Sequence, residues 1–430
     1  MKIYILSLGC AKNRVDSECL AGKLNYAGHT IVDNIENAEV GIINTCGFIR
    51  PAIEENISEI LDLELLKQEK KLKKIGVVGC LYNRYSEELK KEMPSIDFWA
   101  KSEDWESVIK ALGGKSCTTR CRTKLPSSSQ FTRYLKISEG CNNDCTYCAI
   151  PGIRGPLHSL PIDTIIKEAN QLVKDGAKEL CVVGQDLTVY GVDFDNKTHL
   201  IELLDELEKS LPKAIWLRLL YLHPSRVNTE LLERVANGVQ ILPYLDIPVQ
   251  HGDSRILHAM NRGISDEELL SVFSKAREIR NDFTLRTTCM VGFPGEKRTH
   301  FDKMMNFIKK AQFDRMGAFT FFPEEGTPAY SMKGQVSEKT KNDRLAELMS
   351  LQEEISYSRQ QIFLGKEMDV LVETLDRELG IAEGRSYREA PDVDGVIEIR
   401  KISDKINIGD IIKVKMTEAM PHDMIGEEVK

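Results

Sequence analysis

Three cysteines in one short segment are the residues of this sequence best suited to redox chemistry. Cys141, Cys145 and Cys148 stand in the string Cys-Asn-Asn-Asp-Cys-Thr-Tyr-Cys. Thiolates are the usual ligands of iron–sulfur clusters, and three of them can each bind one iron of a 4Fe-4S cube. Because no fourth cysteine follows nearby, one iron would stay open to a small-molecule ligand. The segment therefore predicts a redox-active cluster with one exchangeable position.

A zinc knuckle is the structural alternative for the same three cysteines. Such a site closes around its ion with four protein ligands in tetrahedral geometry. The nearest further candidate ligand is His158. Because the sequence supplies no well-placed fourth ligand, it favours the iron–sulfur interpretation.

A second set of three cysteines is distinguished by position rather than by a short motif. Cys10, Cys46 and Cys80 lie 36 and 34 residues apart, and each follows a short apolar run. The runs cover 3–8, 40–44 and 75–78. If the runs are parallel strands, the cysteines meet in the crevice at the carboxyl ends of the strands. We expect them to bind a second 4Fe-4S cluster; three independent core thiols are the alternative.

Helix-like stretches separate these runs and predict how the cysteines are brought together. Residues 17–27 and 52–68 alternate with the apolar runs in the order β-α-β-α-β. This order is typical of a doubly wound parallel sheet in the α/β class. We assign residues 1–117 to this N-terminal domain. Residues 118–128, rich in Thr, Ser and basic side chains, are expected to form a linker.

Residues 129–363 repeat strand and helix and predict a partial (βα)6 barrel. The strand candidates are 134–138, 179–183, 215–221, 244–249, 284–291 and 316–322. Amphipathic helices are expected at 161–175, 199–209, 229–237, 266–280 and 299–311, and a long charged helix at 337–363.

The last segment, residues 364–430, changes character. Short β-rich runs at 368–373, 395–400 and 411–416 are separated by Gly, Asp and Pro, which predicts a small antiparallel β-barrel. Residues 366–430 contain sixteen acidic and ten basic side chains. This domain is therefore acidic.

The first cysteine loop resembles the cluster-binding loop of the radical S-adenosylmethionine (SAM) superfamily. It matches the pattern C-x3-C-x-aromatic-C, with Tyr147 as the aromatic residue. The resemblance implies that the open iron chelates SAM, that one-electron reduction cleaves SAM, and that a 5′-deoxyadenosyl radical results. The protein would exclude water and aim that radical. No side chain is assigned as catalytic, because the clusters would carry the chemistry.

Further segments of the central domain fit a SAM pocket. Gln185 and Asp186 follow the second strand in Gly-Gln-Asp, which resembles the Gly-Gly-Glu element of the superfamily. Gly292 and Glu296 end the fifth strand, where glycine permits close backbone approach to SAM; a plain strand-to-helix turn is the alternative. Arg218 lies in an apolar strand, and a buried arginine needs an anion. Either the SAM carboxylate or a structural Asp or Glu would serve.

Two three-cysteine sets in one chain resemble the methylthiotransferase family, over essentially the whole chain. That family has an N-terminal cluster domain, a radical SAM domain and a C-terminal TRAM β-barrel. The resemblance implies two SAM per turnover: one methylates a sulfur held at the N-terminal cluster, and the other gives the radical that removes hydrogen from an unreactive carbon, to which the sulfur adds. It also implies a sulfur donor and an electron donor such as a flavodoxin or ferredoxin.

Two branches of that family differ in substrate. Ser-Leu-Gly-Cys-Ala-Lys-Asn at 7–13 and Ala-Pro-Asp-Val-Asp-Gly at 390–395 resemble the RimO family, which modifies the β-carbon of an aspartate in the twelfth small-subunit ribosomal protein. The tRNA-adenosine branch, MiaB, tends to carry Gln-Met-Asn after the first cysteine, and it is the alternative function. An acidic tail favours a basic ribosomal protein over RNA, and we expect Asp392 and Asp394 to dock that protein.

Composition excludes some other classes of protein. The 430 residues are 42% hydrophobic and 29% charged, with a net charge of −8, as in ordinary globular proteins. No apolar run approaches the ~20 residues that span a bilayer, and no signal peptide is evident. We expect a cytoplasmic protein with reduced cysteines; Cys117 and Cys121 are interpreted as linker thiols. A non-catalytic zinc or iron–sulfur scaffold is the remaining alternative of another class.

Overall fold

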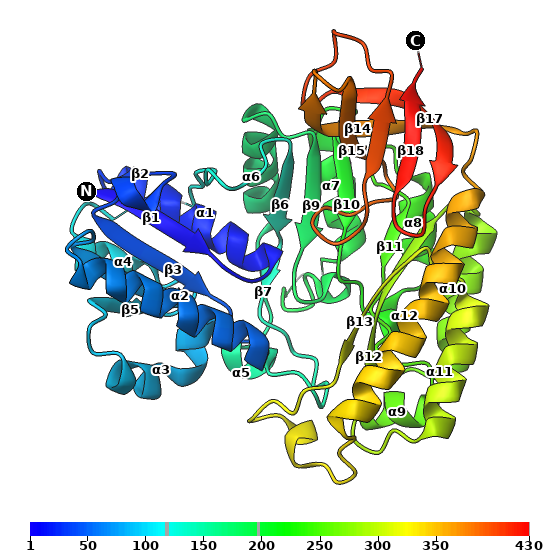
Figure 1. Ribbon diagram of the computed structural model, residues 1–430, viewed down its shortest axis with the longest axis horizontal. Coiled ribbons are helices and arrows are strands. Elements are labelled where there is room, and N and C mark those ends of the chain that lie inside the picture. The colour runs from blue at the N-terminus through cyan, green and yellow to red at the C-terminus, as the bar shows by residue number, and fades with distance from the viewer. Residues whose placement is uncertain (117–119, 196–197, 430) are drawn as a thin grey trace.

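The computed structural model describes residues 1–116, 120–195 and 198–429, in three units that follow one another along the chain (Figure 1). A parallel-sheet domain is followed by a half-open barrel and by a small closed barrel that lies against one end of it. Cys117 is outside the described residues. Within the described part of the chain, no helix is both long and apolar enough to cross a membrane.

The N-terminal domain is a five-stranded parallel sheet in the order β2-β1-β3-β4-β5. Its elements are β1 (Lys2–Ser7), α1 (Ala11–Tyr26), β2 (Thr30–Ile31), β3 (Val40–Thr45), α2 (Arg50–Gln68), β4 (Lys74–Gly79), α3 (Cys80–Glu92), β5 (Phe98–Ala100) and α4 (Trp105–Leu112). α1 and α4 share one hydrophobic cluster with the sheet, and α2 and α3 share another. The predicted doubly wound sheet is confirmed; β2, β5 and α4 were not predicted.

The central domain contains the six predicted strands, and its neighbouring strands run parallel. They are β6 (Thr132–Lys136), β9 (Glu179–Val183), β10 (Trp216–Leu219), β11 (Tyr244–Asp246), β12 (Thr284–Val291) and β13 (Arg315–Thr320). An isolated parallel bridge between Leu217 and Ile241 joins the sheet β10-β9-β6 to the sheet β11-β12-β13. The partial barrel is therefore confirmed.

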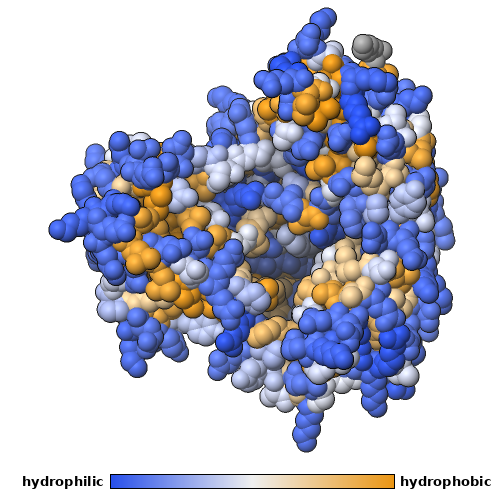
Figure 2. Space-filling model, viewed as in Figure 1, coloured by the Kyte–Doolittle hydropathy of each residue, from blue (hydrophilic) through white to orange (hydrophobic). Residues whose placement is uncertain are grey.

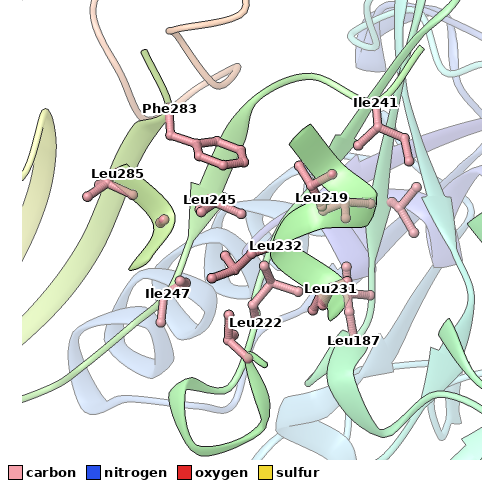
Figure 3. Packing of buried hydrophobic residues seen from close by; sticks show 14 of the residues in the cluster. Leu187, Leu219, Leu222, Leu231, Leu232, Ile241, Leu245, Ile247, Phe283 and Leu285 are labelled. Atoms are coloured by element: carbon pink, nitrogen blue, oxygen red, sulfur yellow. The ribbon is translucent and has the colours of Figure 1, made fainter. Parts of the chain in front are cut away.

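Helices cover the outside of this barrel. They are α6 (Ile162–Lys174), α7 (Leu200–Ser210), α8 (Thr229–Asn237), α10 (Asp266–Ile279), α11 (Arg298–Ala311) and α12 (Glu338–Gln361). The short helices α5 (Ile150–Arg154) and α9 (Ser254–Ala259) lie in loops of the same domain. Figure 3 shows Leu232 of α8 pointing toward Leu245 and Ile247, whereas Leu231 lies beside Leu187. Burial of such side chains fixes the barrel wall on which the site is built.

The C-terminal domain is a closed five-stranded barrel in the order β14-β15-β16-β18-β17. Its strands are β14 (Glu367–Asp376), β15 (Ile381–Arg385), β16 (Ile397–Arg400), β17 (Ile411–Ala419) and β18 (Met424–Glu428). All pairs are antiparallel except β16 with β18. The small β-barrel is thus confirmed, with one parallel pair as a difference.

The loop between β15 and β16 attaches this barrel to the rest of the chain. Asp392 pairs with Arg14 of α1 at 3.1 Å and accepts a hydrogen bond from the Tyr134 hydroxyl at 2.8 Å. Asp394 accepts from the Tyr244 hydroxyl at 2.5 Å, and its side chain is only 4% exposed. The expectation that both aspartates dock a substrate is therefore wrong for Asp394, because its carboxylate is buried between domains.

Candidate functional site

The first cysteine set lies on a loop between two small elements of the central domain. Strands β7 (Ser138–Glu139) and β8 (His158–Ser159) form a hairpin that encloses this loop and α5. The amide of Cys141 donates to the Gly155 carbonyl at 3.1 Å, and the amide of Cys148 donates to the Cys145 carbonyl at 3.1 Å. The first hydrogen bond fixes the start of the loop, and the second fixes the turn between Cys145 and Cys148.

The second set lies where three neighbouring strands end. Cys10 caps α1 after β1, Cys46 follows β3, and Cys80 opens α3 after β4. Gly9, at φ +88°, permits the close approach, because a Cβ on it would lie 2.8 Å from the Cβ of Cys46. Asn13 donates to the carbonyls of Leu8 and Thr45 at 2.9 Å, so one side chain joins two of the strand ends.

Both sets open into one cavity of about 350 Å³ between the N-terminal domain and the central barrel. All six predicted cysteine ligands are among its lining residues. Figure 2 shows the molecule hollowed in the middle, between these two domains. The sequence alone places the two sets 61 residues or more apart, and the fold brings them to the walls of the same chamber.

The spacing of the sulfur atoms distinguishes a cluster from a single ion. Among the described residues, neither cysteine set brings all three of its sulfur atoms within 4.8 Å of one another. Tetrahedral zinc, with Zn–S bonds of about 2.3 Å, needs sulfurs about 3.8 Å apart. A 4Fe-4S cube spreads its ligands over separate irons and fits wider sets. The donor sets therefore fit iron–sulfur clusters better than zinc.

A compact carboxylate group lies close by but is filled by a lysine. Asp16, Glu103 and Glu139 place oxygen atoms within 4.8 Å of one another. The Lys136 ammonium contacts the three carboxylates at 2.5, 2.7 and 2.7 Å. This group is an ion-pair network rather than a metal site.

The same network ties the two cysteine sets together. Arg154, at the end of α5, donates to the Cys80 sulfur at 3.0 Å and to Asp16 at 2.7 Å. Asp16 lies on α1, which begins directly after Cys10. The side chains of Arg154, Asp16 and Lys136 are at most 2% exposed. Because breaking a buried ion pair is costly, this network holds the two domains in one relative position.

Burial also sets the protonation of the thiols. It raises the pKa of Cys46 to about 11 and that of Cys148 to about 12, and it raises the pKa of Cys80 and Cys141 as well. These cysteines are therefore neutral at pH 7 without a metal. Cluster binding deprotonates them and releases protons.

Two of the residues predicted to contact SAM line this cavity. They are Gln185 and Asp186. Asp186 accepts from Asn143 of the cysteine loop at 2.8 Å and pairs with Arg226 at 3.0 Å. On the same wall Gln250 is buried, and its side-chain oxygen has no hydrogen-bond partner. An unpartnered acceptor fits a ligand with hydroxyl or amine donors, as SAM has.

The other three predicted SAM contacts lie outside the cavity lining. Arg218 is fully buried and pairs with Glu179 at 2.6 Å and with the Tyr387 carbonyl, so it has the structural role named above as its alternative. Glu296 pairs with Arg344 at 2.6 Å and accepts from the Gly292 amide at 2.8 Å. For Gly292 and Glu296 this is the turn named above as the alternative, and contact of these three residues with SAM stays a prediction.

Several further lining residues were not predicted from the sequence as site residues. They include the polar or aromatic side chains of Lys12, Tyr221, His223, Gln250 and Arg262. Tyr221 and Gln250 have φ of +69° and +72°, which residues other than glycine rarely adopt and which often marks a functional site. Burial, with Arg262 and Arg226 nearby, lowers the pKa of His223 to about 2, so its ring is neutral. Only Lys12 had a sequence signal, its place two residues after Cys10.

Comparison with known proteins agrees with this architecture. Residues 2–101 match the model described as uncharacterized protein family UPF0004, residues 135–308 the radical SAM superfamily and residues 364–429 the TRAM domain. The chain is 41% identical to the ribosomal protein uS12 methylthiotransferase RimO of Aquifex aeolicus, over 100% of this chain and 98% of that protein. The chain belongs to the RimO family of methylthiotransferases. The relative from Carboxydothermus hydrogenoformans is 40% identical, with 99% of each chain covered.

RimO family membership makes this chain a radical SAM transferase, with SAM and 4Fe-4S clusters as cofactors. Solved structures support the fold. The cobalamin-dependent SAM radical enzyme OxsB gives a TM-score of 0.53 at 12% identity, covering 82% of this chain and 56% of its own. The radical SAM methyltransferase TsrM from Kitasatospora setae gives 0.54 at 13% identity, covering 76% of each chain. At such identities the likeness concerns the fold alone.

Proposed function

We propose that this enzyme adds a methylthio group to the β-carbon of an aspartate in ribosomal protein uS12, using two SAM molecules per turnover. The observation that carries the proposal is the shared cavity, whose walls hold two sets of three cysteines from two domains. The substrate follows from the relatives, which are named as uS12 methylthiotransferases at about 40% identity over the whole chain.

Each cysteine set has its own part in the proposal. Cys141, Cys145 and Cys148 hold the cluster that binds SAM, and Cys10, Cys46 and Cys80 hold the auxiliary cluster. When bound, the clusters and SAM supply a methyl group, a sulfur atom and a one-electron route to hydrogen removal from an unreactive carbon. The protein does not need a general base, because an ordinary base cannot take a proton from such a carbon.

The residues of the chain position and shield this chemistry. The network of Arg154, Asp16 and Lys136 fixes the distance between the two sets. Apolar side chains in the cavity lining, among them Phe48, Ile150 and Leu222, exclude water from the space between them. Exclusion of water protects a reactive species from side reactions.

Partners and location extend the proposal. Reducing equivalents come from a flavodoxin or ferredoxin, and a separate donor replaces the sulfur that leaves with the product. The enzyme works in the cytoplasm, where uS12 is made. The acidic C-terminal barrel disfavours RNA as the substrate.

One experiment separates the proposal from its alternatives. Anaerobically reconstituted enzyme, dithionite and SAM with a deuterated methyl group are incubated with uS12 or with tRNA, and the products are weighed. We expect labelled methylthio-aspartate in uS12, with 5′-deoxyadenosine and S-adenosylhomocysteine in equal amounts. Modified tRNA with unmodified uS12 would overturn the substrate, and unequal amounts of the two SAM products would overturn the two-SAM stoichiometry.

The metal content tests the ligand assignment in the same preparation. About eight irons per chain are expected for two 4Fe-4S clusters. Replacing Cys10, Cys46 and Cys80 together by alanine should leave about four irons and abolish methylthio transfer. Bound zinc without iron would favour the non-catalytic scaffold.

A further inference from the structure

Lys12 is a buried cation without an anionic partner. Its side chain lines the cavity, the residue is 7% exposed, and its ammonium lies 3.8 Å from the centre of the Tyr221 ring. Among the residues that the structure describes, no carboxylate or carbonyl oxygen lies within bonding distance of this ammonium. A buried charge is normally paired, because removing it from water is costly. Lys12 is thus a charge that lacks its counter-ion.

The other cations of the cavity wall are already engaged. Arg154 pairs with Asp16 at 2.7 Å. Arg262 donates to the Pro248 carbonyl at 2.6 Å and to the Cys145 sulfur at 3.5 Å, and only its Nε lacks a partner. Among the described residues, Lys12 is therefore the lining cation with neither an ion-pair nor a hydrogen-bond partner, and its ammonium can bind an anion that enters the cavity.

The ring beneath Lys12 is held in a strained position. Tyr221 has φ of +69°, its amide donates to Asp246 at 3.0 Å, and its carbonyl accepts from the Leu187 amide at 3.1 Å. Such a conformation persists only where its surroundings enforce it. A tyrosine face attracts a cation without neutralising it. The ring therefore orients the ammonium and leaves its charge available.

We propose that Lys12 binds the side-chain carboxylate of the target aspartate. This inference rests on the function proposed above. The carboxylate is bonded to the carbon that is modified, so holding the carboxylate fixes that carbon in the cavity. Lys12 follows Cys10 by two residues, so the target carbon is held beside the cysteines of the auxiliary cluster. The carbon also faces the cysteines of the SAM-binding cluster, which line the same cavity. An asparagine in place of the aspartate would leave the ammonium unpaired.

The test compares Lys12→Met, Lys12→Arg and the control Lys174→Met, an exposed lysine at the end of α6. Binding of two fluorescent uS12 peptides, with Asp or Asn at the target position, is measured by anisotropy on the reconstituted enzyme without reductant. Loss of one charge-assisted hydrogen bond predicts roughly ten- to hundredfold weaker binding of the Asp peptide to Lys12→Met. The Lys12→Met enzyme should also lose its preference for Asp over Asn, whereas Lys12→Arg should keep it.

Other outcomes separate this inference from the proposed function. Wild-type enzyme that binds the Asp and Asn peptides equally, or Lys12→Met that keeps the preference, overturns the role of Lys12. Weaker SAM binding in Lys12→Met with unchanged peptide binding assigns the ammonium to the SAM carboxylate and also overturns it. Loss of iron in Lys12→Met indicates a role in cluster assembly and overturns it as well. Failure of wild-type enzyme to modify uS12 contradicts the proposed function, while the binding comparison still tests Lys12.

Discussion

Replacing Asp16 by asparagine should loosen the contact that holds the two cysteine sets together. Asp16 receives Lys136 at 2.5 Å and Arg154 at 2.7 Å, and the three side chains are almost completely buried. Burial alone would raise the pKa of Asp16, but Lys136 and Arg154 lower it to about 2 from an ordinary 3.8. Asparagine keeps the shape and removes the charge.

The size of the effect follows from that pKa. The lowering of this pKa from 3.8 to about 2 corresponds to about 2.5 kcal/mol of folding free energy at neutral pH. In the variant, Lys136 and Arg154 stay buried without their shared anion. This raises the expected loss of folding free energy to about 3–5 kcal/mol. The unfolding temperature should fall by on the order of 5–10 °C. Asp33→Asn, an exposed change in the same domain, is the matched control and should change it little.

Two assays check this prediction. In the first, reconstituted Asp16→Asn should form less methylthio product per 5′-deoxyadenosine than wild type, because the two clusters no longer keep a fixed distance. In the second, the cluster-free proteins are unfolded by heat at several pH values. Because the folded-state pKa is lowered, the carboxylate stabilises the fold above pH ~4 and this contribution disappears as the pH falls toward 2. The difference from Asp16→Asn should therefore vanish only in acid. An equal unfolding temperature at pH 7, together with an unchanged product ratio, would refute the reasoning.

Three further predictions concern the cluster sites and the barrel contact. Gly9→Ala should lose about four irons because its Cβ would meet a neighbouring cysteine, whereas Gly28→Ala, at φ +91° with open space around it, should keep the full iron content on metal analysis. Arg154→Met should lower the reduction potential of the auxiliary cluster in a redox titration followed by EPR, because a positive charge 3.0 Å from the Cys80 sulfur is lost; an unchanged potential would count against this contact. Glu179→Gln should lower the unfolding temperature, because the buried Arg218 and Arg385 lose their shared anion at a cost of about 3–5 kcal/mol. Glu373→Gln, at the more exposed rim, should lower it much less. Equal shifts of the two variants in calorimetry would contradict this prediction.

The sequence was sufficient to predict those features that depend on residues close together in the chain. The Cys141 loop is a contiguous motif, and the strand ends before Cys10, Cys46 and Cys80 follow from apolar runs at one βα spacing. The short elements β2 and β5 have two and three residues, too few for any periodic pattern to show. Their places in the sheet depend on pairing with distant strands.

The surroundings of the predicted SAM contacts could not be read from the sequence, for a different reason. Arg218 looked like an anion-binding residue, but its partners are Glu179 and two carbonyls of the C-terminal domain, about 170 residues away in the chain. Tyr221 and Gln250 belong to the cavity because of backbone angles that no side-chain pattern reveals. Tertiary context therefore determined which polar residues face the ligand.

The contact between Arg14 and Asp392 has a consequence for how the enzyme is made. The two residues are separated by 378 positions, and the loop that carries Asp392 also attaches to the central barrel through Tyr134. At a synthesis rate of about 5–20 residues per second, the first helix leaves the ribosome roughly 20–75 s before its partner exists. The N-terminal cysteines therefore spend that interval in a domain without its final neighbours. Every lining residue of the cavity precedes Asp392 in the chain, so the clusters can be loaded before this last contact forms.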